Sequence, residues 1–323
     1  MTKKKVIKGV ILFTVYNIIF IFLIRYVVNN AEIMQRIASA PLHYVFLGMC
    51  SSAVCMILTG LMDVCCAWVY GVKIRYGESI GLTYIASSIN LILPLQMGSI
   101  VKAVYFKKKI TLSYSKYISI VSGTVVINLM VTFVQLIVCL IISALKWEVS
   151  SFYIFVLTVI FAAAIICFAL ALFFQDSIMK ILPFKKISVP IMQGFFELMN
   201  DRKAMFLVTI NLIVSALLGG LRFSFIFKML GFDSDVLNSM LYYGFYAAST
   251  IVPILPGNIG ISETLVGIMN TILGSDFDIG VTVVLVNRVY YYMVAIAGAL
   301  MAAFPIWQLY NKAQKTNRED LNE

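Results

Sequence analysis

Ile92-Leu93-Pro94-Leu95-Gln96-Met97-Gly98 and Ile254-Leu255-Pro256-Gly257-Asn258-Ile259-Gly260 are two copies of one phrase, each inside a long apolar stretch. Both copies read Ile-Leu-Pro, any residue, a side-chain amide, Met or Ile, and Gly. Proline removes a backbone donor and clashes with the preceding helical turn, and glycine relaxes the backbone. The phrase therefore predicts two broken helices at matching places in two halves of the chain, a pattern typical of binding sites in membrane transporters.

The alternative interpretation is that each proline only kinks a membrane helix, which such helices often tolerate. Two copies that share the amide and the glycine favour a functional pair. We expect the helix breaks at the prolines and glycines of both phrases and of the Pro-Ile-Leu-Pro run: Pro94, Gly98, Pro253, Pro256, Gly257 and Gly260.

Composition indicates a membrane protein. Hydrophobic residues make up 61% of the 323 positions and charged residues 12%. Apolar runs longer than about 18 residues recur from end to end, which is typical of polytopic α-helical membrane proteins. The net charge of +10 comes from short loops between apolar segments, where basic residues orient a membrane protein and attract anionic lipids. We therefore expect no nucleic-acid partner and no soluble catalytic domain.

Six apolar stretches are long enough to cross a bilayer, which takes about 20 helical residues. They run over Lys8–Val28, Tyr44–Tyr70, Tyr117–Leu145, Phe152–Phe174, Ala204–Met229 and Gly280–Tyr310. The two broken segments cover Ile80–Phe106 and Asn238–Leu273. The expected fold class is an all-α polytopic membrane protein with eight hydrophobic segments, six of them full spans.

Loop charges predict how the broken segments lie in the membrane, because basic loops stay in the cytoplasm. If each segment enters and leaves on one side, the N-terminal lysines, the Lys107–Lys109 run, the basic connector after Phe174 and the C-terminal tail are all cytoplasmic. If both segments cross, Lys107–Lys109 lie outside. We therefore expect two re-entrant hairpins that enter from opposite faces, and cytoplasmic termini in a multi-pass protein of the cell membrane.

This arrangement is an inverted-topology repeat, in which each half consists of two helices, a hairpin and a further helix. The expected organisation is a single membrane domain, 1–310, built of repeats 1–150 and 151–310, and a cytoplasmic polar tail, 311–323. Inverted repeats suit alternating access, since one conformation becomes the other when the halves exchange shapes.

Five charged residues fall inside apolar segments: Asp63, Lys102, Arg222, Glu263 and Arg288. Each costs about 2.5–3.5 kcal/mol to insert, so an intramembrane charge is a functional hypothesis by default. Their depths predict two polar clusters, one in each leaflet. Asp63 and Lys102 belong to the cytoplasmic side, whereas Arg222, Glu263 and Arg288 belong to the outer side.

Lys102 has two possible roles. If the returning half-helix begins at Gly98 or Ser99, Lys102 lies in its first turn, where a cation opposes the helix dipole unless an anion is bound. The free N–H groups, Ser99 and Lys102 would then suit a phosphate. Alternatively, Lys102 pairs with Asp63 or extends to the interface.

The outer cluster leaves similar alternatives open. Gly260 predicts the start of a half-helix with Glu263 at its third position, the capping-box place for an acid. Glu263 is then a cap, a partner for Arg288 or Arg222, or a proton carrier that couples transport. The two arginines form structural ion pairs or a bidentate phosphate clamp. Asp63 carries the same alternatives of ion pair or coupling residue.

Three stretches resemble the signature of a known family: Leu93–Lys102, Pro253–Glu263 (PILPGNIGISE), and Asn287–Tyr292 with Gly298. They are similar to the lysylphosphatidylglycerol synthase transmembrane region, also called flippase-like, which includes the flippase half of the multiple peptide resistance factor. The resemblance covers nearly the whole chain. Relatives often carry a basic residue, Gly-Glu and a later Arg in the first stretch. This chain has Gln96, Gly98-Ser99 and Lys102 there, so it lacks the acidic position.

The resemblance implies a membrane domain that moves a lipid between leaflets, such as an anionic or aminoacylated phospholipid or a lipid-linked sugar. It does not imply lysyl transfer, because in full-length relatives that chemistry belongs to a soluble C-terminal domain and this chain ends soon after its last predicted helix. The alternative is a membrane subunit or remnant of a phosphatidylglycerol lysyltransferase-type enzyme.

Enzymatic chemistry has no recognisable centre in the sequence. We find no carboxylate pair, metal-ligand spacing or nucleophile–base arrangement at membrane depth. The six cysteines show no CxxC spacing and no neighbouring histidine cluster. We therefore expect a transporter, with no catalytic residue, metal or cofactor.

The expected partners are membrane lipids. The candidate substrate contacts are Lys102, Arg222, Arg288, Gln96, Ser99, Asn258, Glu263 and Tyr291. The Tyr290–Tyr292 run either lines the outer end of the path or forms an aromatic belt. A third interpretation is a scaffold for a lipid-modifying enzyme on the cytoplasmic face, where an apolar stripe between Ile191 and Met199 suits the membrane surface.

Overall fold

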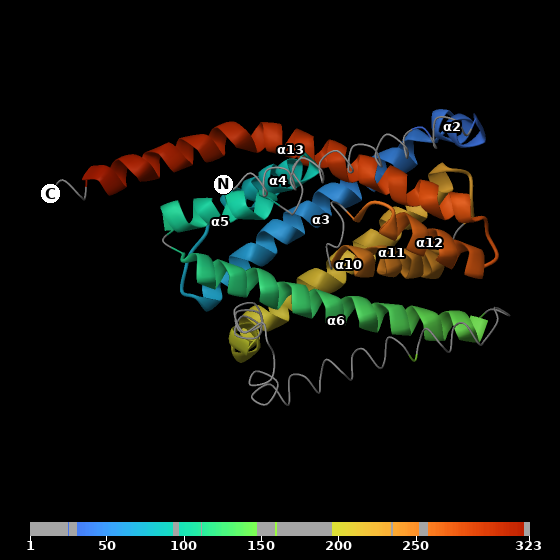
Figure 1. The fold of residues 1–323 in the computed structure, drawn as a ribbon, viewed down its shortest axis with the longest axis horizontal. Coiled ribbons are helices and arrows are strands. Elements are labelled where there is room, and N and C mark those ends of the chain that lie inside the picture. Colours follow the sequence, from blue (N-terminus) through green and yellow to red (C-terminus); the bar gives the residue numbers. More distant parts are fainter. Residues whose placement is uncertain are drawn as a thin grey trace, which may run out of the picture.

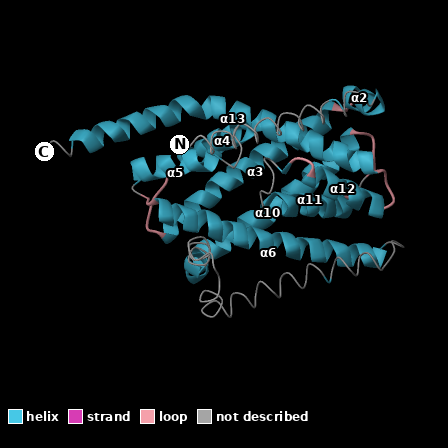
Figure 2. Ribbon diagram, viewed as in Figure 1, coloured by secondary structure: helices cyan, strands magenta, loops and turns pink. Residues whose placement is uncertain are grey.

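The computed structural model describes residues 31–92, 97–110, 112–146, 196–233, 235–251 and 258–319, together with residues 25 and 159. All regular structure in this part of the chain is helical, as Figure 2 shows. The predicted spans Lys8–Val28 and Phe152–Phe174 therefore lie outside the described residues, apart from one position in each.

Four of the six predicted spans, and both predicted broken segments, have matching helices among the described residues. The long ones are α3 (Leu42–Val69), α6 (Tyr114–Lys146), α10 (Arg202–Met229) and α13 (Phe277–Glu319). The short ones are α2 (Ala31–Ala38), α4 (Tyr76–Ile92), α5 (Met97–Ile110), α11 (Val236–Ile251) and α12 (Ile261–Ile272). Each predicted broken segment thus corresponds to a pair of short helices. These are α4 and α5 in the first half of the chain, and α11 and α12 in the second half.

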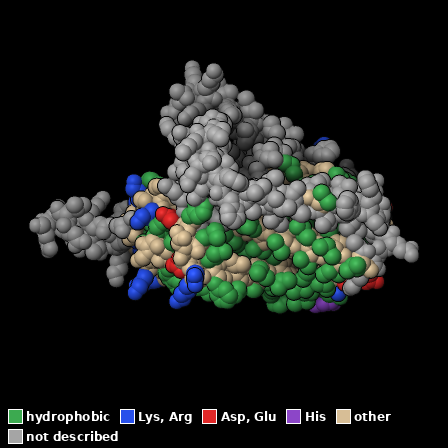
Figure 3. Space-filling model, turned by 90° about the horizontal axis from the view of Figure 1, so that it is seen from below, with side chains coloured by type: hydrophobic (Ala, Val, Ile, Leu, Met, Phe, Trp, Pro, Cys, Tyr) green, Lys and Arg blue, Asp and Glu red, His purple; other side chains and the backbone are tan. Residues whose placement is uncertain are grey.

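Four helices, α3, α6, α10 and α13, are each long and apolar enough to cross a membrane. Their outward faces carry large exposed apolar side chains, such as Val138 on α6 and Leu300 and Phe304 on α13. Figure 3 shows the same feature as a broad hydrophobic band, with Lys and Arg gathered at one end of the molecule. The predicted all-helical multi-pass membrane protein is confirmed.

One element differs from the sequence-based expectation. Helix α13 continues to Glu319, well into the stretch predicted as a polar tail, and passes through Pro305. Residues such as Gln308, Lys312 and Ala313 are good helix formers, so the helix propagates beyond the apolar segment.

The long helices cross in a simple pattern. Helices α3 and α10 pack against each other and run diagonally between α13 and α6, which lie on opposite sides of the bundle (Figure 1). Helix α4 packs on α13, and α11 packs on α6. The first element pair α4–α5 lies at one end of the bundle, and α11–α12 lies at the other (Figure 1).

The two halves repeat their local structure. Helices α3 and α10 each contain 28 residues and end in a left-handed glycine, Gly71 (φ 69°) and Gly231 (φ 78°). In each turn the residue after glycine donates its N–H to a carbonyl five residues back: Val72 to Ala67, and Phe232 to Phe227. This is the Schellman arrangement, which needs a positive φ that glycine adopts without strain.

Each of these turns is covered by a short helical segment that precedes the other long helix. Arg36 on α2 donates from Nη1 to the carbonyl of Leu230 (3.0 Å) and lies over the Phe232 ring (4.5 Å to the centroid). At the opposite turn, Tyr70 donates to the carboxylate of Glu197. Helices α3 and α10 therefore end in the same type of glycine turn, and each turn is contacted by the short segment that precedes the other helix.

Candidate functional site

The first polar cluster joins α5 to α3 and α4. The Lys102 Nζ of α5 donates to the Asp63 carboxylate of α3 and to Thr83 Oγ1 of α4 (2.9 Å). Lys102 is only 6% exposed. The structure therefore places Lys102 in the ion pair that was one of its two predicted roles. Thr83 was missed, although its four-residue spacing from Ser79 and Ser87 signals a polar face on α4.

The start of α5 differs from the expected phosphate nest. The helix begins at Met97, so Lys102 lies in its second turn, beyond the strongest part of the helix dipole. The Gly98 N–H donates to Asn90 Oδ1 (2.7 Å), so this donor is already satisfied. A Cβ on Gly98 would lie 1.9 Å from the Ala86 carbonyl oxygen, so glycine is required here by close helix contact. Ser99 is half-buried in the same turn.

A second ion pair lies further along α5. Lys109 Nζ is 2.7 Å from the Glu78 carboxylate and donates to the Tyr105 hydroxyl (3.2 Å). Glu78 is 5% exposed and opens α4, whereas Lys109 closes α5. Sequence reasoning missed this pair because Glu78 lies just before the predicted apolar segment. An acid in the first turn of a helix was the available signal.

The second polar cluster joins α12 to α13. Arg288 Nε donates to Glu263 Oε1 (2.7 Å), and its Nη2 donates to Ser262 Oγ (2.6 Å) and to the Asn258 carbonyl (3.3 Å). The other oxygen of Glu263 accepts the Gly260 N–H (2.8 Å). Glu263 thus serves both as the cap of α12 and as the partner of Arg288.

The phrase itself positions this cluster. Gly260 precedes α12 with φ 90°, and Asn258 has φ 50°. The buried Asn258 side chain donates to the Ser249 carbonyl (2.6 Å), which ties the end of the phrase to α11. The positive φ of both residues lets the backbone turn sharply into the first residues of α12.

Arg222 on α10 differs from the other buried charges. It is 5% exposed, and among the described residues no carboxylate lies within ion-pair distance of it. Its Nη1 donates to Ser52 Oγ at 3.4 Å, and its guanidinium lies over the Tyr243 ring (5.8 Å). Its Nε finds no acceptor in the described structure.

Tyrosine side chains lie near the two arginines. The Tyr246 hydroxyl lies within electrostatic reach of both Arg222 and Arg288. The Tyr291 hydroxyl donates to Ser87 Oγ of α4 (3.0 Å) and is within reach of Arg222 and Tyr246. Tyr243, Tyr246 and Tyr291 are half-buried. Side chains of α3, α11 and α13 therefore lie near Arg222, and Tyr291 links this region to α4.

The Tyr290–Tyr292 run turns inward over part of its length. Tyr290 is buried and donates to the Met229 sulfur (2.9 Å), and its ring packs against Gly48. Tyr290 and Tyr291 thus face the interior of the helix bundle, unlike the side chains of an aromatic belt at the lipid surface.

Several predicted site and hinge residues fall outside the described part of the chain. These are Pro94, Gln96, Pro253, Pro256 and Gly257. The predicted site residues that the structure describes fall into three places: the Lys102 cluster, the Arg288 cluster, and the surroundings of Arg222 on α10. In the described ranges no three His, Cys, Asp or Glu side chains gather as a metal site would need.

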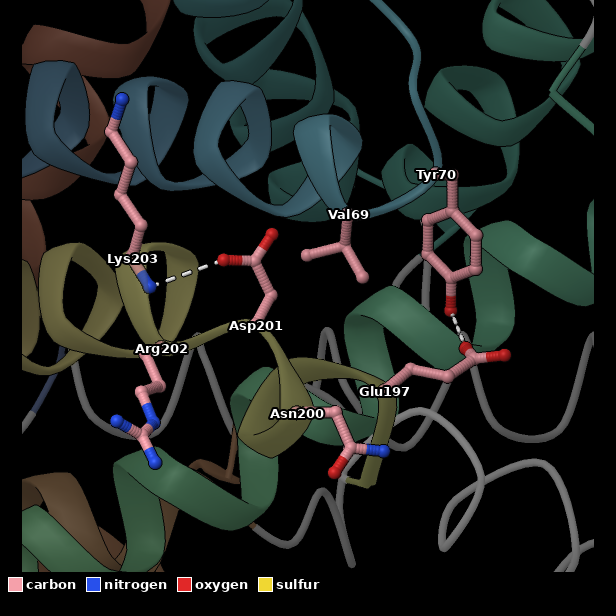
Figure 4. A pocket seen from close by; sticks show the side chains of 7 residues that line it. All are labelled: Val69, Tyr70, Glu197, Asn200, Asp201, Arg202 and Lys203. Atoms are coloured by element: carbon pink, nitrogen blue, oxygen red, sulfur yellow. Dashed lines mark hydrogen bonds between the residues drawn. The ribbon is translucent and has the colours of Figure 1, made fainter.

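A polar hollow of about 700 Å³ lies away from these clusters, where α3 ends and α10 begins (Figure 4). Figure 4 shows the Tyr70 hydroxyl on Glu197 and the Asp201 carboxylate on the Lys203 backbone N–H. Burial, followed by the Glu197 contact, raises the pKa of Tyr70 above its ordinary value. The Asp201 cap starts α10. The polar side chains around the hollow are thus used to join the end of α3 to the start of α10.

Comparison with known proteins adds one match. The model of the lysylphosphatidylglycerol synthase transmembrane (TM) region family matches residues 6–298. No curated protein matches the chain significantly.

Proposed function

Because the chain belongs to the lysylphosphatidylglycerol synthase transmembrane region family, we propose that it moves a lipid with an anionic head group between the two leaflets of the membrane. The substrate class is an anionic or aminoacylated phospholipid or a lipid-linked sugar. The family name motivates the lipid, and the buried charges motivate the phosphate or other anionic group that every candidate shares.

Arg222 is the observation that carries this proposal. A guanidinium cannot lose its charge in a protein, and a buried unpaired ion costs several kcal/mol. Arg222 has Ser52 and Tyr243 beside it and an Nε without an acceptor in the described structure. A bound phosphate would neutralise the charge and accept from the forked N–H donors.

The other two basic clusters are less suited to hold the head group. Lys102 and Arg288 already have carboxylate partners, Asp63 and Glu263. An incoming phosphate would have to displace a buried carboxylate at either place, and the carboxylate would then be unpaired. We therefore assign the anion to Arg222, and the two ion pairs to the walls of its path.

Tyrosines complete the proposed site. The hydroxyls of Tyr246 and Tyr291 lie within electrostatic reach of Arg222, and both side chains are half-buried. The Tyr291 hydroxyl donates to Ser87, and a tyrosine hydroxyl is able to turn toward an anion when it arrives. Arg288 adds positive potential at the Tyr246 hydroxyl.

The proposed path runs between two re-entrant hairpins in an inverted repeat of six full spans. Several observations support it: the short helix pairs lie at opposite ends of the bundle, and Gly71 and Gly231 close equivalent turns. The basic run Lys107–Lys109 lies at the α4–α5 end, as expected for a cytoplasmic end. In this arrangement both termini are cytoplasmic, and residues 1–150 and 151–310 form the two repeats.

A second candidate follows from the family name, which refers to a lipid synthase. The chain would then be the membrane subunit or remnant of a lysyltransferase-type enzyme, with the catalytic partner on the cytoplasmic face. Lysyl transfer to phosphatidylglycerol that appears when the purified chain is combined with a cytoplasmic extract, and is absent from the extract alone, distinguishes this candidate from the translocase.

Reconstitution into liposomes tests the translocase directly. Fluorescent phosphatidylglycerol in the inner leaflet is protected from an external quencher until it crosses the bilayer. We expect faster crossing with the protein than in empty vesicles, and faster crossing than for zwitterionic phosphatidylcholine in the same vesicles. Equal rates with and without protein, for phosphatidylglycerol and for lipid-linked sugar phosphates, would contradict the proposal.

A further inference from the structure

One face of α4 carries a continuous row of polar side chains. Ser79, Thr83 and Ser87 are spaced four residues apart and are all buried. Thr83 accepts from Lys102, Ser87 accepts from Tyr291, and Ser79 Oγ has no partner among the described residues. The row therefore leads from the Lys102 cluster to Tyr291, which lies within reach of Arg222.

Helix α5 covers this face along most of its length. Lys109 pairs with Glu78 at the start of α4, Lys102 reaches Thr83 in the middle, and the Gly98 N–H donates to Asn90 near the end. Lys102 and Lys109 are seven residues apart and thus share one face of α5. Two buried ion pairs and one backbone donor hold the cover in place.

The equivalent helix in the second half is fixed differently. Helix α12 packs along α13, where a Cβ on Gly280 would lie 2.8 Å from the Val266 carbonyl and 2.9 Å from the Gly267 Cα. Helix α5 makes few contacts with α6, and its outer face exposes Ile100 and Val101. Close backbone packing on the next long helix therefore holds α12, whereas α5 is held against α4 by the two charge pairs and by the close approach of Gly98 to the Ala86 carbonyl.

We propose that the polar face of α4 is the head-group track that leads to Arg222, and that α5 is its removable cover, closed by the Glu78–Lys109 and Asp63–Lys102 pairs. This inference rests on the proposed translocation of an anionic lipid, and it assigns Glu78 and Lys109 as positioning residues. Thr83 donates to the Ser79 carbonyl, whereas the Ser79 hydroxyl has no partner among the described residues and offers a donor to a phosphate between the entrance and Arg222.

The placement of the outer pair favours closure. Glu78 lies in the first turn of α4 and Lys109 in the last turn of α5, so each charge also complements its own helix dipole. A cover closed in this way opens when the pair is weakened. Reversing both charges restores the pair but loses the dipole contribution, so closure should return only in part.

A native thiol reports on the cover. Cys66 of α3 is fully buried in the same core cluster as Tyr105 and Phe106 of α5. Cys139 of α6 is buried in the cluster at the other end and serves as the internal reference. Modification of both thiols by N-ethylmaleimide is followed by peptide mass spectrometry on the full chain in nanodiscs.

Glu78→Gln should raise the labelling rate of Cys66 at least about fivefold, the effect of losing roughly 1 kcal/mol from a local closing equilibrium, without changing that of Cys139. Lys109→Gln should do the same, and Glu78→Lys with Lys109→Glu should restore slow labelling in part. Asp278→Asn, an exposed acid in the first turn of α13, is the matched control and should have no effect.

Unchanged Cys66 labelling in both single variants would overturn the proposal. Equal acceleration of Cys66 and Cys139 would also contradict it, because the whole fold would then be loosened. The labelling needs no transport, so a cover that opens as expected in a protein that moves no lipid would locate the failure in the proposed function instead.

Discussion

Arg222 and Arg288 both lie within electrostatic reach of the Tyr246 hydroxyl, yet in the described structure only Arg288 of the two has a carboxylate partner. The difference assigns them different roles. Arg288 belongs to a satisfied network with Glu263, Ser262 and the Asn258 carbonyl. Arg222 retains a donor that a ligand can use.

Stability measurements should separate these two arginines. Arg288→Gln leaves the buried Glu263 carboxylate without its charge partner, so we expect a loss of about 3–5 kcal/mol. Arg222→Gln removes an unpaired buried charge, and we expect an unchanged or higher thermal midpoint in detergent. Equal destabilisation by both substitutions would show that Arg222 has a structural partner.

The Lys102–Asp63 pair should behave as a unit. Lys102→Met alone leaves Asp63 buried and unpaired, and Asp63→Leu alone leaves Lys102, so each should destabilise strongly. The double variant replaces the pair by apolar groups and should recover much of the loss. Thermal unfolding of the four proteins gives the coupling free energy. Additive losses would show that the two side chains do not depend on each other.

Close packing at Gly98 gives a prediction independent of charge. Gly98→Ala places a methyl group 1.9 Å from the Ala86 carbonyl oxygen, so α5 must move away from α4, at a cost of about 1–3 kcal/mol or more. Gly77→Ala is the control in the same helix pair, because nothing lies within 4 Å of its Cβ. It should leave stability unchanged or raise it slightly.

The orientation of the hairpins predicts which loops are accessible from outside. Lys108→Cys, in the basic run at the end of α5, should resist a membrane-impermeant maleimide in intact cells and react after lysis. Asp276→Cys, between α12 and α13, should react in intact cells. External labelling of Lys108→Cys would exclude the re-entrant arrangement and the inverted repeat.

Much of the helical framework could be predicted from the sequence because apolar length and proline–glycine breaks are local signals. The α3 and α10 segments were predicted within two residues of their observed ends. The Lys102–Asp63 and Glu263–Arg288 contacts were among the predicted alternatives, since few charges lie at that depth. A charged residue at membrane depth needs a partner of opposite charge, and few such partners are present there.

Other features depend on contacts between distant segments, which the sequence does not display. Asn90 satisfies the Gly98 N–H, so the expected phosphate nest already has an occupant for that donor. Glu78 and Lys109 both lie just outside the predicted apolar segment Ile80–Phe106, so their pairing becomes visible only when α4 and α5 are side by side. The lone position of Arg222 emerges only when the helices around it are in place.

Native mass spectrometry of the protein released from its own membrane tests the central claim, that Arg222 holds an anionic lipid head group. The wild-type protein should retain an anionic phospholipid or lipid-linked sugar phosphate. Arg222→Gln should lose it, while Asp278→Asn should keep it. Equal occupancy by the same anionic lipid in the wild-type protein and in Arg222→Gln would contradict the account.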